Sequence, residues 1–148
     1  MREPLRTLIS APWLIAALCC NAQPDLDSLR SVFMDRSKPD SVRFTAFYDL
    51  TWDGYLFNAP DTAEVMARSL QRDARAKGNT VFEARASELL AAVWYVRGDM
   101  RTALSHYDTA LVLHRRNGDA DGQADVISNM GSMLSYLGEL DSALTLYQ

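Results

Sequence analysis

Apolar positions in the second half of the chain follow the period of an amphipathic helix. Over residues 81–96 apolar side chains recur every three or four positions, which places them on one face of a helix. The pattern is interrupted at Gly98, a residue suited to close the helix at its C-terminal end. A second apolar stripe runs from Met100 to Leu113, and Gly118 follows it. The spacing predicts two helices joined by a glycine turn.

This helical hairpin recurs with a period of forty residues. The positions that repeat best are a turn glycine, an alanine and a tyrosine, which are Gly98, Ala103 and Tyr107 in one copy and Gly138, Ala143 and Tyr147 in the next. A weaker copy lies upstream. Self-similarity at such a period is characteristic of solenoids. The predicted fold class is all-α, an α-solenoid of stacked antiparallel helical hairpins. It covers residues 43–148, with hairpins at 43–79, 80–119 and 120–148, the last incomplete.

The weaker first hairpin is predicted to have helices at about 41–57 and 61–77. Asp40 or Ser41 can cap the first of them, and Pro60 is tolerated where the second begins. Ahead of this hairpin, residues 23–42 are interpreted as a short helix and a linker. The helix carries Leu26, Leu29 and Phe33 at helical spacing and would cover the N-terminal end of the solenoid.

Small residues explain how such hairpins could stack. Ala91 and Gly131 lie on first helices and Ala103 lies on a second helix, where they allow neighbouring helices to approach closely. Trp94 and Tyr107 are expected to fill the space between hairpins. A single hairpin cannot bury this face alone, so the pattern requires neighbours.

The two best copies read ARASELLAAVWYVRGDMRTALSHYDTAL and ADVISNMGSMLSYLGELDSALTLY. Their order of Leu or Met, a small residue, an aromatic or apolar residue, a Gly turn and an Ala-aromatic pair resembles the tetratricopeptide repeat. The usual Trp near the start of the first helix is replaced by Phe47, Ser87 or Ile127. The period is 40 instead of the usual 34, as in a long-hairpin variant of the family. The first unit departs furthest, at Thr51, Gly54 and Ala67.

The resemblance implies that first helices line a concave groove that binds a protein or peptide partner. Carried over residue by residue, it places eight side chains toward the groove: Tyr48, Trp52, Tyr55, Arg85, Glu88, Tyr95, Asp125 and Ser132. Trp, Tyr and Arg are enriched in binding hot spots. The alternative for Trp52 and Tyr55 is that they pack against the N-terminal helix.

The start of the chain has the three-part order of a secretory signal peptide. A short basic start, MREPLR, precedes an apolar run and the polar segment NAQPD. We expect cleavage after Ala22, which makes residues 1–22 a leader; lipidation at Cys19 or Cys20 and an uncleaved anchor are the alternatives. Both cysteines lie in this leader, so the remainder has no disulfide. The expected location is the periplasmic or cell-surface side of a bacterium.

Composition and motifs argue against several functions. The net charge of -4 disfavours nucleic acid as a partner. The stretch NGDADGQADVIS resembles a calcium loop but has Ser128 where a bidentate Glu is needed, so it is interpreted as a turn. His106 and His114, without acidic partners on their own helix face, are expected at the surface. The sequence predicts no cofactor, no metal site and no catalytic residue.

The function implied by the resemblance is that of a protein–protein interaction module. The segment LTWDGYLFNAPDTA looks like the input region of certain bacterial signalling proteins. We therefore expect an exported sensor or scaffold domain at the N-terminal part of a longer signal-transduction protein. One alternative is a stand-alone periplasmic or surface-tethered adaptor. Another is the non-catalytic part of an enzyme, a histidine kinase or nucleotide cyclase, whose active site lies beyond residue 148. Membrane contact is expected through the signal or a downstream span.

Overall fold

The computed structural model describes residues 25–146, and within this range the chain forms seven α-helices and no β-strand. The helices are α1 (Leu26–Met34), α2 (Asp40–Gly54), α3 (Pro60–Ala76), α4 (Thr80–Val96), α5 (Met100–Asn117), α6 (Ala120–Tyr136) and α7 (Leu140–Leu146). The leader predicted at residues 1–22, which contains both cysteines, lies outside the described residues. None of the helices in the described part is both long enough and apolar enough to cross a membrane.

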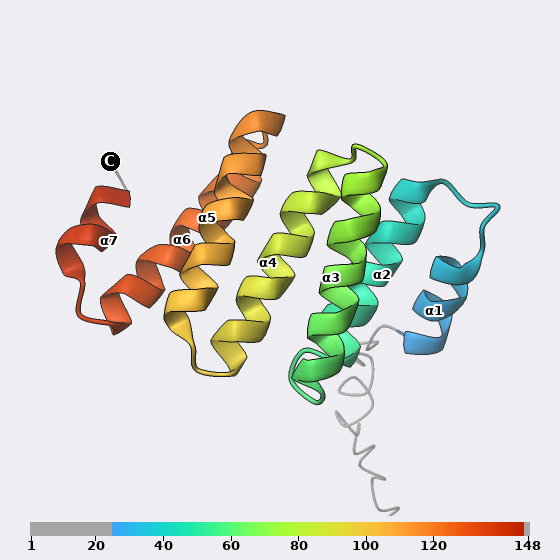
Figure 1. The fold of residues 1–148 in the computed structure, drawn as a ribbon, viewed down its shortest axis with the longest axis horizontal. Helices are drawn as coiled ribbons and strands as arrows, with labels where there is room; N and C mark the ends of the chain where they lie inside the picture. The colour runs from blue at the N-terminus through green and yellow to red at the C-terminus, as the bar shows by residue number, and fades with distance from the viewer. Residues whose placement is uncertain (1–24, 147–148) are drawn as a thin grey trace, which may run out of the picture.

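The helices repeat with the period seen in the sequence. The first helices α2, α4 and α6 begin at residues 40, 80 and 120, and the second helices α3, α5 and α7 begin at residues 60, 100 and 140. Each consecutive pair forms an antiparallel hairpin, and the hairpins stack in one row from α1 at one end to α7 at the other (Figure 1). The predicted all-α solenoid of helical hairpins is confirmed.

The connections from α3 to α7 share one construction, which a glycine makes possible. Each contains a glycine in the left-handed region, with φ between 65° and 81°: Gly78, Gly98, Gly118 and Gly138. An L side chain rarely adopts this conformation, so glycine ends each helix at low cost. In three of the four connections the next residue caps the following helix. For example, Asp99 Oδ1 accepts the N–H of Thr102 at 3.0 Å. Gly98 and Gly118 thus have the roles predicted for them.

Small buried residues allow the close stacking of the hairpins. Ala63, Ala103 and Ala143 occupy the same position in the three second helices and are at most 4% exposed. Ala91 is fully buried in α4, facing the same cluster of side chains as Ala103. A larger side chain at these sites would hold the helices apart.

The helix expected near Leu26, Leu29 and Phe33 is α1, and it packs on α2. Phe33 stacks on Phe47, with ring centroids 4.3 Å apart. Leu26 lies over Gly54, where a Cβ would come within 3.3 Å of both Leu26 methyl groups. Gly54, which departs from the repeat pattern, therefore leaves room for Leu26 of α1 to pack on α2.

Two other departures from the repeat pattern are polar residues that bond locally. Thr51 is buried, and its hydroxyl donates to the carbonyl of Phe47 at 2.7 Å. Ser87 is buried as well, donates to the carbonyl of Glu83 at 3.0 Å and accepts from the amide of Gln71 at 3.1 Å. These bonds satisfy the hydroxyls, so the smaller polar residues fit without an unpaired buried group.

The predicted cap of the first hairpin is wrong. Asp40 lies inside α2, Pro39 precedes the helix, and no side chain caps its N-terminus. Asp40 instead pairs with Arg43 at 3.2 Å and with Lys77, the residue directly after α3, and the second pair joins the two helices of the hairpin. These cationic partners compete with the backbone N–H groups for the carboxylate.

The first helix of this hairpin also ends earlier than the expected residue 57. The carbonyl of Thr51 accepts the N–H groups of both Tyr55 and Leu56, at 3.2 and 3.0 Å. This doubled contact closes α2 at Gly54. The chain then needs extended backbone before Pro60, since a residue that precedes proline disfavours the helical conformation. Residues 55–59 therefore form a longer connection than the glycine turns elsewhere.

Candidate protein-binding groove

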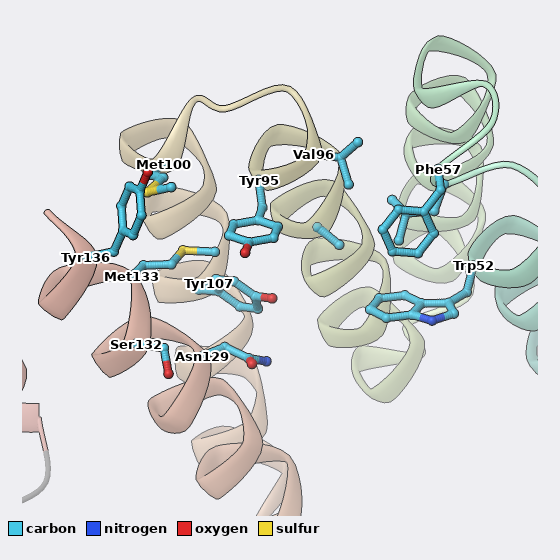
Figure 2. A pocket seen from close by; sticks show the side chains of 12 residues that line it. Trp52, Phe57, Tyr95, Val96, Met100, Tyr107, Asn129, Ser132, Met133 and Tyr136 are labelled. Carbon is cyan, nitrogen blue, oxygen red and sulfur yellow. The ribbon is translucent and has the colours of Figure 1, made fainter.

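A groove of about 720 Å³ runs across the first helices of the three hairpins. Figure 2 shows side chains from α2, α4, α5 and α6 that converge on it. The groove is lined by Trp52, Leu56, Phe57, Ala92, Tyr95, Val96, Met100, Tyr107, Asn129, Ser132, Met133 and Tyr136. Its lining is mostly apolar and aromatic.

The repeat register generates half of this lining. Trp52, Ala92 and Ser132 are forty residues apart, and so are Leu56, Val96 and Tyr136. Each set places one residue on, or just after, each first helix. Because the hairpins share one geometry, equivalent positions face the same side of the stack. The groove is therefore a property of the repeat.

The groove has a buried floor and an exposed aromatic rim. Leu56, Tyr107 and Met133 are at most 6% exposed. By contrast, Phe57 is 70% exposed and Tyr136 is 78% exposed, and the two come from opposite walls (Figure 2). Exposed aromatic side chains that gather around a hollow mark interaction sites in soluble proteins.

Three of the eight residues predicted for the groove line it directly: Trp52, Tyr95 and Ser132. Tyr48 lies one turn before Trp52 on α2, and the two rings stack with centroids 6.1 Å apart and an interplanar angle of 14°. Arg85 places its guanidinium 5.7 Å from the Tyr48 ring centroid and 5.8 Å from that of Phe82. These contacts continue the concave face from the groove toward the N-terminal end of α4.

The remaining three predicted residues lie elsewhere on or near this face. Glu88 contacts a buried side chain of α5, and Asp125 is exposed on α6. The Tyr55 hydroxyl accepts a hydrogen bond from Arg30 of α1 at 2.7 Å. Tyr55 thus packs toward the N-terminal helix, whereas Trp52 faces the groove (Figure 2).

His114 is buried, which makes the prediction of a surface residue wrong. It is 2% exposed, with Nε2 at 2.7 Å from Glu88 and Nδ1 at 2.8 Å from Asp119. The prediction failed because it considered acidic partners only on the same face of α5. The acidic partners of His114 come instead from α4 and from the N-cap of α6. His106, by comparison, is half-buried, and burial lowers its pKa.

The stretch that resembles a calcium loop is a turn followed by the first turns of α6. Asp119 caps this helix by accepting the N–H of Gly122 at 3.0 Å. A Cβ on Gly122 would lie 2.3 Å from Nδ1 of His114, so the glycine is needed for the imidazole to approach. In the described part of the chain, no cluster of His, Cys, Asp and Glu could hold a metal ion.

Burial keeps the phenols of the concave face un-ionised. It raises the pKa of Tyr107 to about 12 and that of Tyr48 well above its usual range, with the nearby Glu88 carboxylate adding to both effects. Both hydroxyls therefore remain hydrogen-bond donors at neutral pH. Burial likewise raises the pKa of Glu88 and Asp49.

The surface around Arg85 and Glu88, in the N-terminal half of α4, is acidic. Asp49 lies near Asp53, whose charge helps to raise the pKa of Asp49, and Asp125 acts on Glu88 in the same way. Arg85 is the cation that opposes both effects. The face thus joins an aromatic groove to a region of net negative charge, which suits a partner with apolar and basic groups.

Comparison with known families supports this architecture. Residues 82–148 match the family model for the tetratricopeptide repeat. This part of the chain, which is less than half of its length, is similar to tetratricopeptide repeats. It contains most of α4 and all of α5 to α7, and α4 to α6 supply most of the groove lining. The groove residues Trp52, Leu56 and Phe57 precede the match. No curated protein and no solved structure matches the chain.

Tetratricopeptide repeats generally mediate protein–protein interactions and are generally non-catalytic. Sequence reasoning missed much of the groove lining, above all the rim residues Phe57 and Tyr136 and the floor residues Tyr107 and Met133. The register could have revealed Tyr136, which stands forty residues after Val96. Phe57 had no such signal, because it lies in the irregular connection after α2.

Proposed function

We propose that the helical solenoid, which includes the segment similar to tetratricopeptide repeats, binds a protein partner through the aromatic groove. The partner segment inserts an apolar or aromatic side chain between α2, α4 and α6. It also places a basic residue near Asp49 and Asp125. The observation that carries this proposal is the exposed aromatic rim around a groove that the repeat register builds.

The exposure of the rim supports a binding role over a structural one. A large aromatic side chain that only stabilised the fold would be buried, yet Tyr95 is 52% exposed and Tyr136 is 78% exposed. Burying such rings against a partner removes apolar area from water at about 25 cal/mol per Å². Rigid aromatic residues also lose little conformational entropy on binding.

The preference for a basic partner follows from the charges at the N-terminal end of the face. Arg85 acts on the carboxyls of Asp49 and Glu88, and Asp53 and Asp125 add negative charge beside them. A lysine or arginine on the partner would gain a carboxylate neighbour, whereas an acidic residue would be repelled. Such charges mainly set specificity and the rate of association.

We further propose a setting for this module, the exported input region of a longer bacterial signalling protein. The leader pattern at residues 1–22 and the resemblance of LTWDGYLFNAPDTA to such input regions support it. The helix starts at a spacing of forty residues support the long-hairpin variant of the repeat. In this setting the groove reads a partner on the periplasmic or cell-surface side.

Selection from a display library of random peptides tests the binding function. The bait is the 148-residue chain, and Tyr95→Ala and Val65→Ala serve as variants. Val65 is 69% exposed on α3 and does not line the groove, so it is a matched control. We expect enriched peptides to contain an aromatic or large apolar residue and a basic residue, and Tyr95→Ala to weaken their binding roughly tenfold. Equal binding by both variants would refute the groove as the site.

Two observations test the proposed setting. Intact mass of the chain from its native host should show loss of residues 1–22; a lipid adduct on Cys20 or an intact leader would contradict cleavage after Ala22. Reading the gene beyond codon 148 should reveal further hairpins, a span of about 20 apolar residues and an output domain. An immediate stop codon would favour an adaptor.

A further inference from the structure

The contact between α5 and α6 differs from the equivalent contact between α3 and α4 at one pair of positions. In the forty-residue register Ala74 corresponds to His114, and Phe82 corresponds to Gly122. Ala74 and Phe82 are both buried in one apolar cluster. At the α5–α6 contact the bulky side chain comes from α5 instead, and the small residue lies on α6. Moving the bulky side chain from one helix to the other keeps the space filled, and it replaces a phenyl ring by an ionisable imidazole.

The residues around the imidazole change with it. Glu88 stands forty residues after Tyr48, and Asp119 stands forty residues after Asn79. Asn79 and Asp119 both cap a helix through the N–H three residues ahead. Asp119 also has its second carboxylate oxygen 2.8 Å from His114. Differences at these positions turn an apolar contact into an ionisable one, formed by His114, Glu88 and Asp119 and called here the His114 cluster.

The His114 cluster needs two protons to make its two hydrogen bonds. Each ring nitrogen faces a carboxylate oxygen, at 2.7 Å for Glu88 and 2.8 Å for Asp119. An ionised carboxylate can only accept, and a neutral imidazole carries one N–H. The second proton therefore lies on the ring, as imidazolium, or on Glu88, as a carboxylic acid. Either arrangement leaves the cluster with a single net negative charge.

Losing one of these two protons would break a hydrogen bond of the buried imidazole, and water could not reach the ring nitrogen to replace it. A ring lone pair would then face a carboxylate oxygen in a site where the imidazole is 2% exposed. The ring nitrogen that lost its hydrogen bond would be buried without a partner, which destabilises the contact. The imidazole cannot turn toward α6, because the backbone of that helix at Gly122 already lies against the ring.

We propose that the His114 cluster is a proton-dependent joint between the second and third hairpins. It holds α6 against α4 and α5 while it retains two protons, and it loosens when rising pH removes one. The effect on binding rests on the proposed function of the groove, because Ser132, Met133 and Tyr136 reach the groove from α6.

Charged groups on both neighbouring helices face the His114 cluster. From α4, Arg85 favours the ionised form of both Glu88 and Asp119. From α6, Asp125 opposes ionisation of Glu88. Tyr48 and Tyr107 lie near Glu88 as neutral phenols. Because burial raises the pKa of both phenols, neither supplies the proton that is lost as pH rises, and we assign that proton to the cluster itself.

The direction of the pH effect follows from the two carboxyls. Burial raises the pKa of Glu88 above its ordinary 4.5, against the opposing effect of the His114 hydrogen bond. A raised folded-state pKa gives stability that is present in acid and is lost as pH rises through that pKa. The Gly122 N–H lowers the pKa of Asp119 below its ordinary 3.8, so that contribution is lost only in stronger acid. The joint is therefore strongest in mildly acidic solution and weakens toward alkaline pH.

The test compares three full-length chains, wild type, Glu88→Gln and the double variant His114→Ala/Gly122→Phe. Each is unfolded with urea at about pH 5 and about pH 8. The glutamine amide can donate to Nε2 without titrating. The double variant recreates the contact that Ala74 and Phe82 already make one unit earlier. We expect the wild-type midpoint to be lower at the higher pH by roughly 0.5 M urea, with a much smaller change in both variants.

Hydrogen exchange locates the effect. Corrected for the intrinsic rate, exchange of α6 amides in wild type should accelerate about tenfold between the two pH values, while α3 amides should not change. An equal pH response in wild type and Glu88→Gln would overturn the joint. If the double variant does not fold, the glutamine variant still decides the question.

Binding is measured separately, with a peptide obtained by selection against the groove. We expect its affinity for wild type, but not for the double variant, to fall several-fold at the higher pH. Because the stability comparison uses no partner, a failure of the groove to bind peptides leaves the joint intact. A pH-dependent stability with a pH-independent affinity would refute the link between the joint and the groove.

Discussion

Two contacts between successive hairpins occupy the same place in the repeat but have different chemistry. Between α3 and α4, Phe82 fills the space beside Ala74 and meets Phe44 edge-on, with ring centroids 5.3 Å apart. Between α5 and α6, His114 fills the equivalent space beside Gly122 and bonds to carboxylates on both neighbouring helices. The first contact is apolar and the second is ionisable.

The difference shows which property of the contact the solenoid requires. Backbone register and filled volume are the same at both places, since helix starts keep their spacing of forty residues. Which helix supplies the large side chain, and whether that side chain is ionisable, is free to vary. A repeat fold can therefore keep its shape while one contact becomes sensitive to solution conditions and its neighbour does not.

Truncation of the apolar contact should have the largest effect. Phe82→Ala removes a ring that is 7% exposed and leaves a cavity between α2, α3 and α4. We expect the free energy of unfolding to fall by about 3–4 kcal/mol, equally at acidic and alkaline pH. Urea unfolding measures it. A loss below about 1 kcal/mol would mean that the contact is not the packed core described above.

A methyl group at the ionisable contact should have the next largest effect. In Gly122→Ala the new Cβ would overlap Nδ1 of His114, so the imidazole must move and lose its partners. We expect a loss of about 2 kcal/mol by urea unfolding. Adding His114→Ala should restore part of this stability, because the clash disappears. A double variant less stable than Gly122→Ala alone would show that the ring and the glycine are not coupled.

Ion pairs that join the units should matter less, and unequally. Arg97 pairs with Asp61 and Glu64 of α3, both at 2.5 Å, and lies 4.8 Å from the Trp94 ring centroid. Arg101 pairs with Glu139 at 2.6 Å, but its side chain is 76% exposed. We expect Arg97→Gln to cost about 1 kcal/mol and Arg101→Gln less than about 0.5 kcal/mol. Equal losses in thermal unfolding would show that exposure does not separate them.

The sequence predicted the repeat because each of its signals is local. Gly98 and Gly118 end their helices in the left-handed conformation. Ala103 and Ala143 are buried where neighbouring helices approach closely. Such features act within a few residues and recur at a fixed spacing. Periodicity alone therefore sufficed to predict the hairpins and their stacking.

Features that depend on contacts between neighbouring hairpins could not be predicted from the sequence. The neighbours of His114 come from α4 and α6, and the spacing along α5 carries no information about them. The carboxylate of Asp40 could cap α2 or pair with a cation, and the proximity of Lys77 across the hairpin decided the outcome. In the groove, Tyr95 was found because it lies on a first helix, whereas Phe57 follows an irregular connection.

The most direct test of the central claim is the dissociation constant of one groove-selected peptide for three chains: wild type, Trp52→Ala and Val65→Ala. Trp52 lines the groove from α2 and is 37% exposed, whereas Val65 is exposed on α3 outside it. We expect Trp52→Ala to weaken binding about tenfold or more and Val65→Ala to leave it unchanged. Unchanged affinity in Trp52→Ala would contradict the assignment of the groove as the binding site.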